Sequence, residues 1–408
     1  MQSFFESWQG RVVLLLLLVG GAFLIFSYSS QSSSEKDHKL SRDFTQPKSY
    51  GSLDDLMHAK DTDCIDLNCF DDYFSDITQE YGPEPALLLL ARYQETGKIT
   101  RSLDDHQLAH RIGRKTAEMF GVNPQAFDLC GTSFNYGCQH GFFEYVLGHT
   151  DTTKDAATLI CESIDGSKPP KSRFYCYHGV GHGVMMARAN DIFESVRECD
   201  TLVDATAQDG CWQGAFMENV NAGMKGESKS NVFSETDPLA PCNKVEEKYR
   251  HECFINHAGW LMRFFSNDTA KASAACLKAP EANQSACAQS IGLMVTNPSW
   301  QPALLSNAGA KSFEDASWAI CKMFPIQLRR ECMIGAVDNI VNFDELKGAR
   351  AGAFCKRAPA DLADDCWRVF GRNLTQQTTD QDIIRTICLN TAPPAYQQIC
   401  LNGAGIHQ

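Results

Sequence analysis

The sequence lacks the motifs that identify several large classes of enzymes and binding proteins. It contains no glycine-rich phosphate-binding loop, no Gly-x-Ser-x-Gly nucleophile elbow and no Cys-x-x-Cys-His attachment site for haem. It also lacks a block of basic residues, because its net charge of -13 is spread along the chain. Nucleic acid is therefore not an expected partner, since phosphate binding requires a cationic surface.

Long apolar runs are also scarce, and the one that stands out lies at the N-terminus. Residues Val12 to Phe26 are all apolar or glycine, and residues 12–28 together reach the lower length limit of a transmembrane helix. We predict a cytoplasmic segment at 1–11, a single membrane anchor at 12–28 and a flexible stalk at 29–61. The alternative is a signal peptide cleaved near Ser27-Tyr28-Ser29, where small residues suit a cleavage site.

No cysteine is left over when the eighteen Cys are paired in sequence order. So many thiols indicate an oxidising compartment, so we place the C-terminal domain on the extracytoplasmic side (periplasmic, lumenal or extracellular) of a single-pass membrane protein. No Cys then remains as a candidate nucleophile. The expected pairs are Cys64/Cys69, Cys130/Cys138, Cys161/Cys176, Cys199/Cys211, Cys242/Cys253, Cys276/Cys287, Cys321/Cys332, Cys355/Cys366 and Cys388/Cys400.

The cysteine pairs recur along the chain, which indicates an internal repeat. The segment within each pair is short and polar, as between Cys161 and Cys176, and fits the turn of a helical hairpin. An apolar stretch follows the second Cys, often with a glycine three residues later, as at Gly141 and Gly214, where a missing side chain lets helices approach closely. We predict an all-α, solenoid-like array of helical hairpins over 62–408, each pinned by a local disulfide.

A Cys pair across a helical hairpin, with Gly in the second helix, resembles the disulfide-stapled Sel1-like and tetratricopeptide-like repeats. The resemblance spans about Cys130 to Gln408. It implies an architecture in which stacked hairpins bury a continuous core. Ahead of it, Pro85 to Thr96 and Leu103 to Phe120 fit the two helices of a first repeat.

Histidines cluster in the first repeats at a spacing of four residues, which places both members of a pair on one helical face. The pairs are His106 and His110, His140 and Glu144, and His178 and His182. His140 and His178 each follow the second Cys of their pair by two residues, so they occupy equivalent positions in successive repeats. We assign 85–190 to repeats that form a metal site and 191–408 to further repeats.

Imidazoles combined with a carboxylate favour a divalent transition metal, and zinc, iron and copper all suit such ligands. We predict that the six residues of these pairs bind metal, either one ion or two ions that share Glu144. Glu144 is also the candidate catalytic residue, as a ligand or as a general base. No organic cofactor is predicted. The alternatives are a polar pocket without metal and unrelated hydrogen-bonded His pairs.

Three functions are compatible with this pattern. The first is a metalloenzyme, either a hydrolase or an oxidase, and the second is a scaffold that binds a protein or peptide partner on the concave face of the solenoid. The third is storage or delivery of metal without catalysis. Candidate contacts to the metal ligands or to a substrate are Gln213, Glu218, Asn219 and His257, for which capping or ordinary surface polarity is the alternative.

Overall fold

The computed structural model describes residues 47–99, 105–150, 153–225, 232–297, 312–343 and 348–407. Within these ranges the chain is helical and forms no strand. The chain from Pro47 to Gln408 is one compact unit. The prediction of an all-α fold is therefore confirmed, whereas the predicted segments 1–11 and 12–28 lie outside the described residues.

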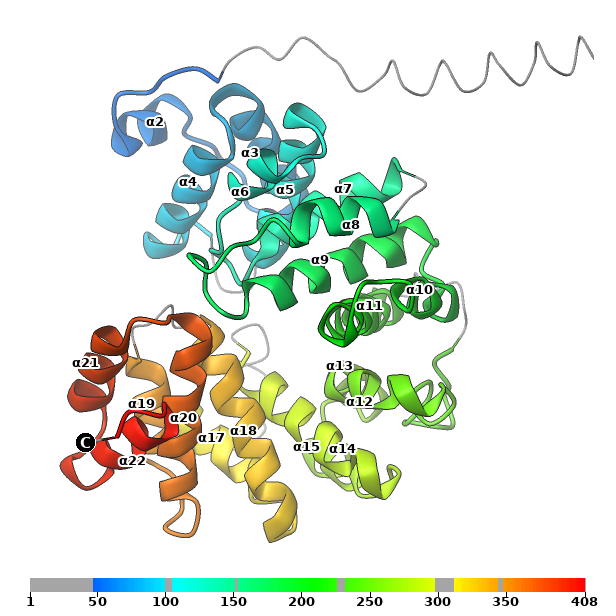
Figure 1. The fold of residues 1–408 in the computed structure, drawn as a ribbon, viewed down its shortest axis with the longest axis vertical. Helices are drawn as coiled ribbons and strands as arrows, with labels where there is room; N and C mark the ends of the chain where they lie inside the picture. Colours follow the sequence, from blue (N-terminus) through cyan, green and yellow to red (C-terminus); the bar gives the residue numbers. More distant parts are fainter. Residues whose placement is uncertain are drawn as a thin grey trace, which may run out of the picture. The chain divides into compact units, whose positions relative to one another are not determined.

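The helices follow one another along the array (Figure 1). In the first half they are α2 (Leu53–Ala59), α3 (Leu67–Tyr81), α4 (Pro83–Glu95), α5 (Asp105–Phe120), α6 (Pro124–Asp128), α7 (Gly137–Gly148), α8 (Thr153–Cys161), α9 (Ser172–Ala187), α10 (Ile192–Cys199) and α11 (Ala205–Lys225). In the second half they are α12 (Glu247–Ile255), α13 (Ala258–Phe264), α14 (Thr269–Cys276), α15 (Glu281–Val295), α17 (Phe313–Cys321), α18 (Ile326–Phe343), α19 (Ala349–Cys355), α20 (Ala363–Gln377), α21 (Gln381–Thr391) and α22 (Pro394–Gly403).

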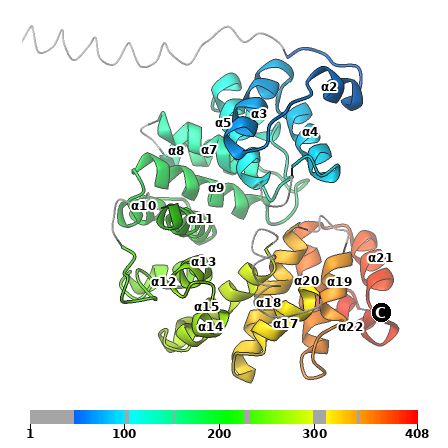
Figure 2. The ribbon, with the colours of Figure 1, turned by 180° about the vertical axis from the view of Figure 1, so that it is seen from behind.

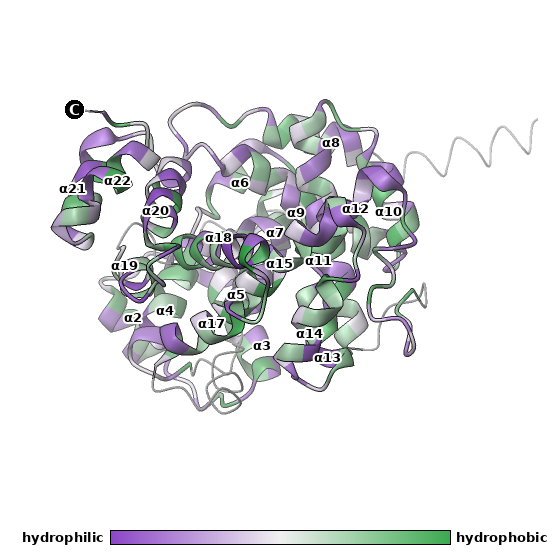
Figure 3. Ribbon diagram, turned by 90° about the horizontal axis from the view of Figure 1, so that it is seen from below, coloured by the Kyte–Doolittle hydropathy of each residue, from purple (hydrophilic) through white to green (hydrophobic). Residues whose placement is uncertain are grey.

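Hydrophobic and hydrophilic residues are mixed along the helices, as expected where one face of a helix packs on the core and the other meets solvent (Figure 3). Among the described residues, no helix combines the length and the hydropathy that crossing a membrane would require.

The predicted stalk at 29–61 ends earlier than the composition suggested. Residues from Pro47 onward belong to the compact unit, and α2 lies within the segment predicted to be flexible. Ser52 caps this helix by accepting a hydrogen bond from the backbone N–H of Asp55, and Leu56 is buried. Leu53 and Met57, which are partly buried, also pack against the core, so three apolar residues dock the helix. Their helical spacing covers little more than one turn, which is too short to stand out in a polar segment.

All nine disulfides join the pairs that the sequence predicts, and no Cys is left unpaired. In most repeats the first helix ends at the first Cys, as α8 does at Cys161, and the second Cys lies near the start of the next helix, as Cys176 does in α9. Each of these disulfides therefore closes one helical hairpin, whereas Cys64–Cys69 joins the segment before α3 to the first turn of α3. The pair Cys242 and Cys253 departs from this scheme, because Cys242 lies in a turn and α12, which contains Cys253, is short.

Glycines bring the second helices of neighbouring hairpins into backbone contact. A Cβ added to Gly141 of α7 would lie 1.9 Å from the carbonyl oxygen of His110 in α5, and one added to Gly113 of α5 would lie 1.8 Å from that of Cys138 in α7. No side chain fits at either position. The same reciprocal contact recurs between α9 and α11, α15 and α18, and α20 and α22, through Gly181 and Gly214, Gly292 and Gly335, and Gly371 and Gly403.

The C-terminal repeats contact the start of α9. Figures 1 and 2 both show α18 and α20 side by side. In α18, the side chain of Asn342 accepts a hydrogen bond from Lys171 Nζ at 2.9 Å and donates one to the hydroxyl of Tyr175 at 3.0 Å. The backbone N–H of Lys171 donates to the carbonyl of Gln376 in α20. Helices far apart in the sequence thus enclose one cavity.

Candidate metal centre

Five histidines from three successive repeats meet between α5, α7 and α9. His106 and His110 come from α5, His140 from α7, and His178 and His182 from α9. All except His106, which is partly buried, are about 1% exposed. The four-residue spacing puts each pair on one face of its helix, and the glycine contact between α5 and α7 brings the first two faces together.

The ligating atoms form two groups of three. His106, His110 and His140 offer nitrogens that all lie within 4.8 Å of one another, and so do His140, His178 and His182. His140 belongs to both groups. These clusters could hold a metal ion, as the sequence predicted, but they are joined through an imidazole and not through Glu144.

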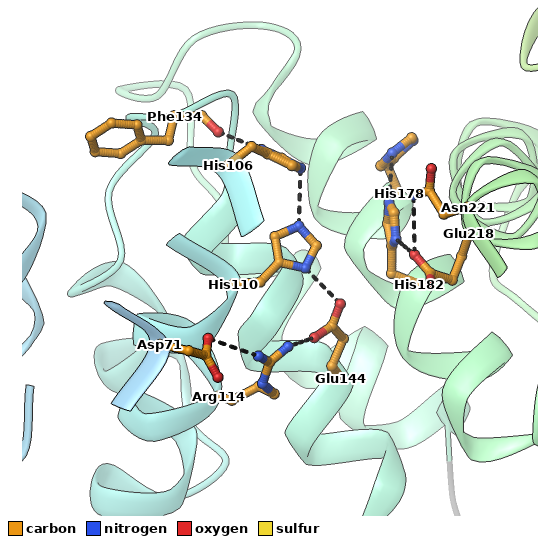
Figure 4. Close-up of polar contacts among 10 residues, drawn as sticks. All are labelled: Asp71, His106, His110, Arg114, Phe134, Glu144, His178, His182, Glu218 and Asn221. Carbon is orange, nitrogen blue, oxygen red and sulfur yellow. Dashed lines mark hydrogen bonds and ion pairs between the residues drawn. The ribbon is translucent and has the colours of Figure 1, made fainter. Parts of the chain in front are cut away.

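Each of the four outer histidines has its Nδ1 atom fixed by an acceptor, and Figure 4 shows these contacts for His106, His110 and His182. The acceptors are the Phe134 carbonyl for His106 at 2.7 Å, Glu144 for His110 at 2.6 Å, Gln213 Oε1 for His178 at 3.1 Å and Glu218 for His182 at 3.0 Å. None of these oxygens has a proton to give, so each Nδ1 carries the hydrogen. The Nε2 atom of each ring is then the lone-pair nitrogen, which is the tautomer that binds metal.

The Nε2 atoms face one another at short range. They are 3.0 Å apart between His106 and His110, and 3.2 Å apart between His178 and His182. Two lone pairs at this separation repel unless a cation lies near both. Two nitrogens bound about 2.0 to 2.1 Å from one ion, at an angle of about 90° to 109°, are about 2.9 to 3.4 Å apart. The residues present therefore fit a metal ion at each pair.

His140 lies between the two pairs and has no hydrogen bond. Both of its ring nitrogens are buried without a partner in the described structure. Its ring centroid is 5.4 Å from those of His106 and His110 and 5.0 Å from those of His178 and His182. Burying an imidazole without a hydrogen bond costs free energy, and coordination to a cation would offset that cost.

Burial favours the neutral form of two imidazoles of the centre. Together with the neighbouring histidines, it lowers the pKa of His140 and of His178 well below the ordinary value. Burial acts to raise the pKa of Glu144, but its interactions with His110 and Arg114 outweigh it and leave this pKa well below the usual range. His140 and His178 are thus neutral at neutral pH, which is the state that metal binding needs.

Glu144 lies beside the two groups of histidines and belongs to neither. One carboxylate oxygen accepts from His110 Nδ1 and the other accepts from Arg114 at 2.6 Å, and Arg114 in turn lies 3.8 Å from Asp71 (Figure 4). Both carboxylate oxygens of Glu144 therefore have other partners and do not contact the Nε2 atoms of the histidines. Arg114 was missed in the sequence, although its place four residues after His110 put it on the same helical face.

The centre opens onto a cavity of about 580 Å³. His106, His140 and His178 line this cavity, whereas His110 and His182 do not. A small molecule in the cavity would therefore reach the centre from one side.

The other candidate contacts divide into two kinds. Gln213 and Glu218 lie against His178 and His182, as predicted for partners of metal ligands. Asn219 is buried, with a side-chain oxygen that has no partner. His257 hydrogen-bonds through Nε2 to the carbonyl of Pro238 at 2.7 Å and belongs to neither group of histidines, and burial lowers its pKa to about 4.

Comparison with known proteins gives no relative for this chain: no family model, no curated protein and no solved structure matches it. The resemblance to Sel1-like and tetratricopeptide-like repeats is therefore limited to the stapled helical hairpin.

Proposed function

We propose that this protein is an extracytoplasmic metalloprotein whose five histidines bind transition-metal ions at one wall of the cavity. The observation that carries the proposal is the orientation of the four outer rings. Each Nδ1 is held by an acceptor, and the Nε2 lone pairs converge in pairs at 3.0 and 3.2 Å. A buried structural His pair would also need acceptors for its N–H groups, but it would have no reason to set two lone-pair nitrogens against each other.

The arrangement supports two ions. Each three-His group would hold one ion, and His140, with both ring nitrogens unpaired, would give one nitrogen to each as an imidazolate, after its N–H proton is released to solvent. In this assignment the shared ligand is His140, and Glu144 and Glu218 orient the rings of His110 and His182 as carboxylate partners.

Of the two enzyme classes that the sequence left open, hydrolase and oxidase, the site favours an oxidoreductase. Hydrolysis would use a free carboxylate as general base, but Glu144 is held by His110 and Arg114 and does not line the cavity. An all-imidazole ligand set suits copper and iron as well as zinc. A bound copper or iron ion would supply electron transfer with a molecule in the cavity, while the chain's own residues orient the ligands. The cavity favours catalysis over storage, because stored metal needs no room for a substrate.

Elemental analysis of the full-length chain, purified after export into an oxidising compartment, tests the proposal. We expect about two equivalents of copper or iron per chain, one for each three-His group. Zinc alone would support the hydrolase in place of the oxidoreductase. A chain that is metal-free and binds none of these ions at neutral pH would refute the metal centre, and the predicted protein- or peptide-binding scaffold would then be the better explanation.

Replacing Glu144 with glutamine tests whether this residue orients His110 or binds metal itself. The amide keeps an oxygen that can accept from His110 Nδ1 but loses the charge. We expect the metal affinity to fall about 10- to 100-fold, as for other partners of ligating histidines, with two equivalents still bound at saturating metal. Isothermal titration of the metal-free chain measures both quantities. Loss of an entire equivalent at saturation would identify Glu144 as a direct ligand.

We further propose that the described domain lies outside the cytoplasm, tethered by the apolar segment at 12–28. Nine disulfides with no cysteine left over support an oxidising compartment. We expect the protein to stay with membranes after a carbonate wash, and its C-terminus to be accessible to protease from the extracytoplasmic side. A mature N-terminus near Ser29 would show that the segment is a cleaved signal peptide.

A further inference from the structure

Neutral amides line much of the cavity. Among the residues that line it from α15, α18 and α20 are Gln289, Asn339, Asn342, Asn373, Gln376 and Gln377. Side-chain amides both donate and accept hydrogen bonds, so they suit a ligand rich in hydroxyl groups. Apolar side chains, among them Met217, Ile255 and Leu293, also line the cavity and can pack against the carbon atoms of such a ligand.

Lys171 is the one buried ammonium of this cavity. It precedes α9 and is only 9% exposed, and its Nζ lies 5.4 Å and 5.1 Å from the ring centroids of Tyr136 and Tyr175. Its hydrogen-bond acceptor is Asn342 Oδ1 at 2.9 Å, and no carboxylate of the described residues forms an ion pair with it. Burial lowers the pKa of Lys171 to about 7.

This ammonium has binding capacity to spare. A lysine has three N–H donors, and Asn342 takes one of them. A buried charge without a counter-ion is unfavourable, and an anion in the cavity would compensate it. Asp338, the one carboxylate of the lining, is engaged elsewhere, because it accepts from Asn373 and lies 3.8 Å from Arg372.

The position of Lys171 relative to the histidines sets the size of the ligand. Tyr175 lies between them: its ring centroid is 5.1 Å from Lys171 Nζ and 5.8 Å from that of His178. A molecule of a few carbon atoms would thus reach from Lys171 to the centre.

We infer that the cavity binds a small hydroxylated carboxylate, with its carboxylate on Lys171, its hydroxyl groups on the amides of α18 and α20, and its far end at the histidines. Its role as a substrate rests on the proposed function, whereas its binding requires only the cavity and Lys171.

Calorimetric titration of the full chain with matched acids and neutral analogues tests this inference. The probes are gluconate against glucitol and lactate against 1,2-propanediol. We expect at least one acid to bind at least about tenfold more tightly than its neutral analogue, since hydrogen bonds to charged groups contribute about that much. The preference should hold in metal-free chain as well, so a failed metal centre would not affect the result.

Lys171→Met keeps the aliphatic stem and removes the charge, and we expect it to abolish the preference for the acid. Lys171→Arg should retain it, and Lys168→Met, at an exposed lysine paired with Asp128, should leave it unchanged. If Lys171 only joined α9 to α18, Lys171→Met would lower the melting temperature without changing the ratio of the two affinities. That outcome, or equal binding of both members of each pair, or no binding of either acid, would overturn the inference.

Discussion

Replacing His140 with alanine is expected to reduce the affinity for transition metal by more than about 100-fold. Loss of a partner that merely orients a ligand costs about 10- to 100-fold, and His140 is placed to be a ligand of both three-His groups. Each remaining pair would keep its two Nε2 atoms but would lose its third nitrogen. Metal content after dialysis against a weak chelator should therefore fall at both groups together.

His106→Ala and His251→Ala provide the comparison. His106 belongs to one group, so its loss should release about one equivalent and leave the group around His178 and His182 occupied. His251 lies in α12, where its side chain is 60% exposed, and its loss should not change the metal content. If His140→Ala releases no more metal than His106→Ala, His140 is not shared between two ions.

Replacing Gly141 with alanine is expected to damage both stability and the metal centre. The new Cβ would lie 1.9 Å from the carbonyl oxygen of His110, a contact that only a shift of α5 against α7 can relieve. Overpacking of this kind typically lowers the free energy of unfolding by about 1 to 3 kcal/mol, which denaturant titration measures. The same shift would separate His110 from His140, so the metal affinity should fall as well.

Two glycines serve as controls. Gly148 lies in α7, as Gly141 does, but no atom lies within 4 Å of a Cβ added to it. Gly148→Ala should therefore lower neither the free energy of unfolding nor the metal affinity. Gly403 makes the equivalent contact far from the histidines, with an added Cβ 2.1 Å from the carbonyl oxygen of Arg368. Gly403→Ala should lower the free energy of unfolding and leave the metal affinity unchanged. Equal metal loss in Gly141→Ala and Gly403→Ala would mean that general destabilisation, not helix separation, empties the centre.

Several features of the fold could be predicted because they are local in sequence. The disulfides join cysteines that are separated by a single turn, so their order along the chain determined the pairing. The predicted helices at Pro85 to Thr96 and Leu103 to Phe120 correspond to α4 and α5, because their apolar residues follow the helical period.

The histidine pairs were predicted for the same reason, since residues four apart share a helical face whatever the tertiary structure is. The equivalence of His140 and His178 after their cysteines then indicated that successive helices present these residues alike. What the spacing could not give was the role of Glu144. Whether a carboxylate points to the ion or to a ring nitrogen depends on side-chain direction and on Arg114, which reaches it from the neighbouring helix.

The sequence by itself thus determined the elements of this protein: helical hairpins, their staples and the faces that carry histidine. Only the tertiary structure decided how these faces combine. It made His140 the residue common to both groups, and it brought Lys171 next to Asn342, which lies 171 residues further along the chain. The physical reason is that hydrogen bonds and disulfides within a hairpin follow from local spacing, whereas contacts between distant repeats depend on the small rotation added at every helix contact, such as those at Gly141 and Gly214.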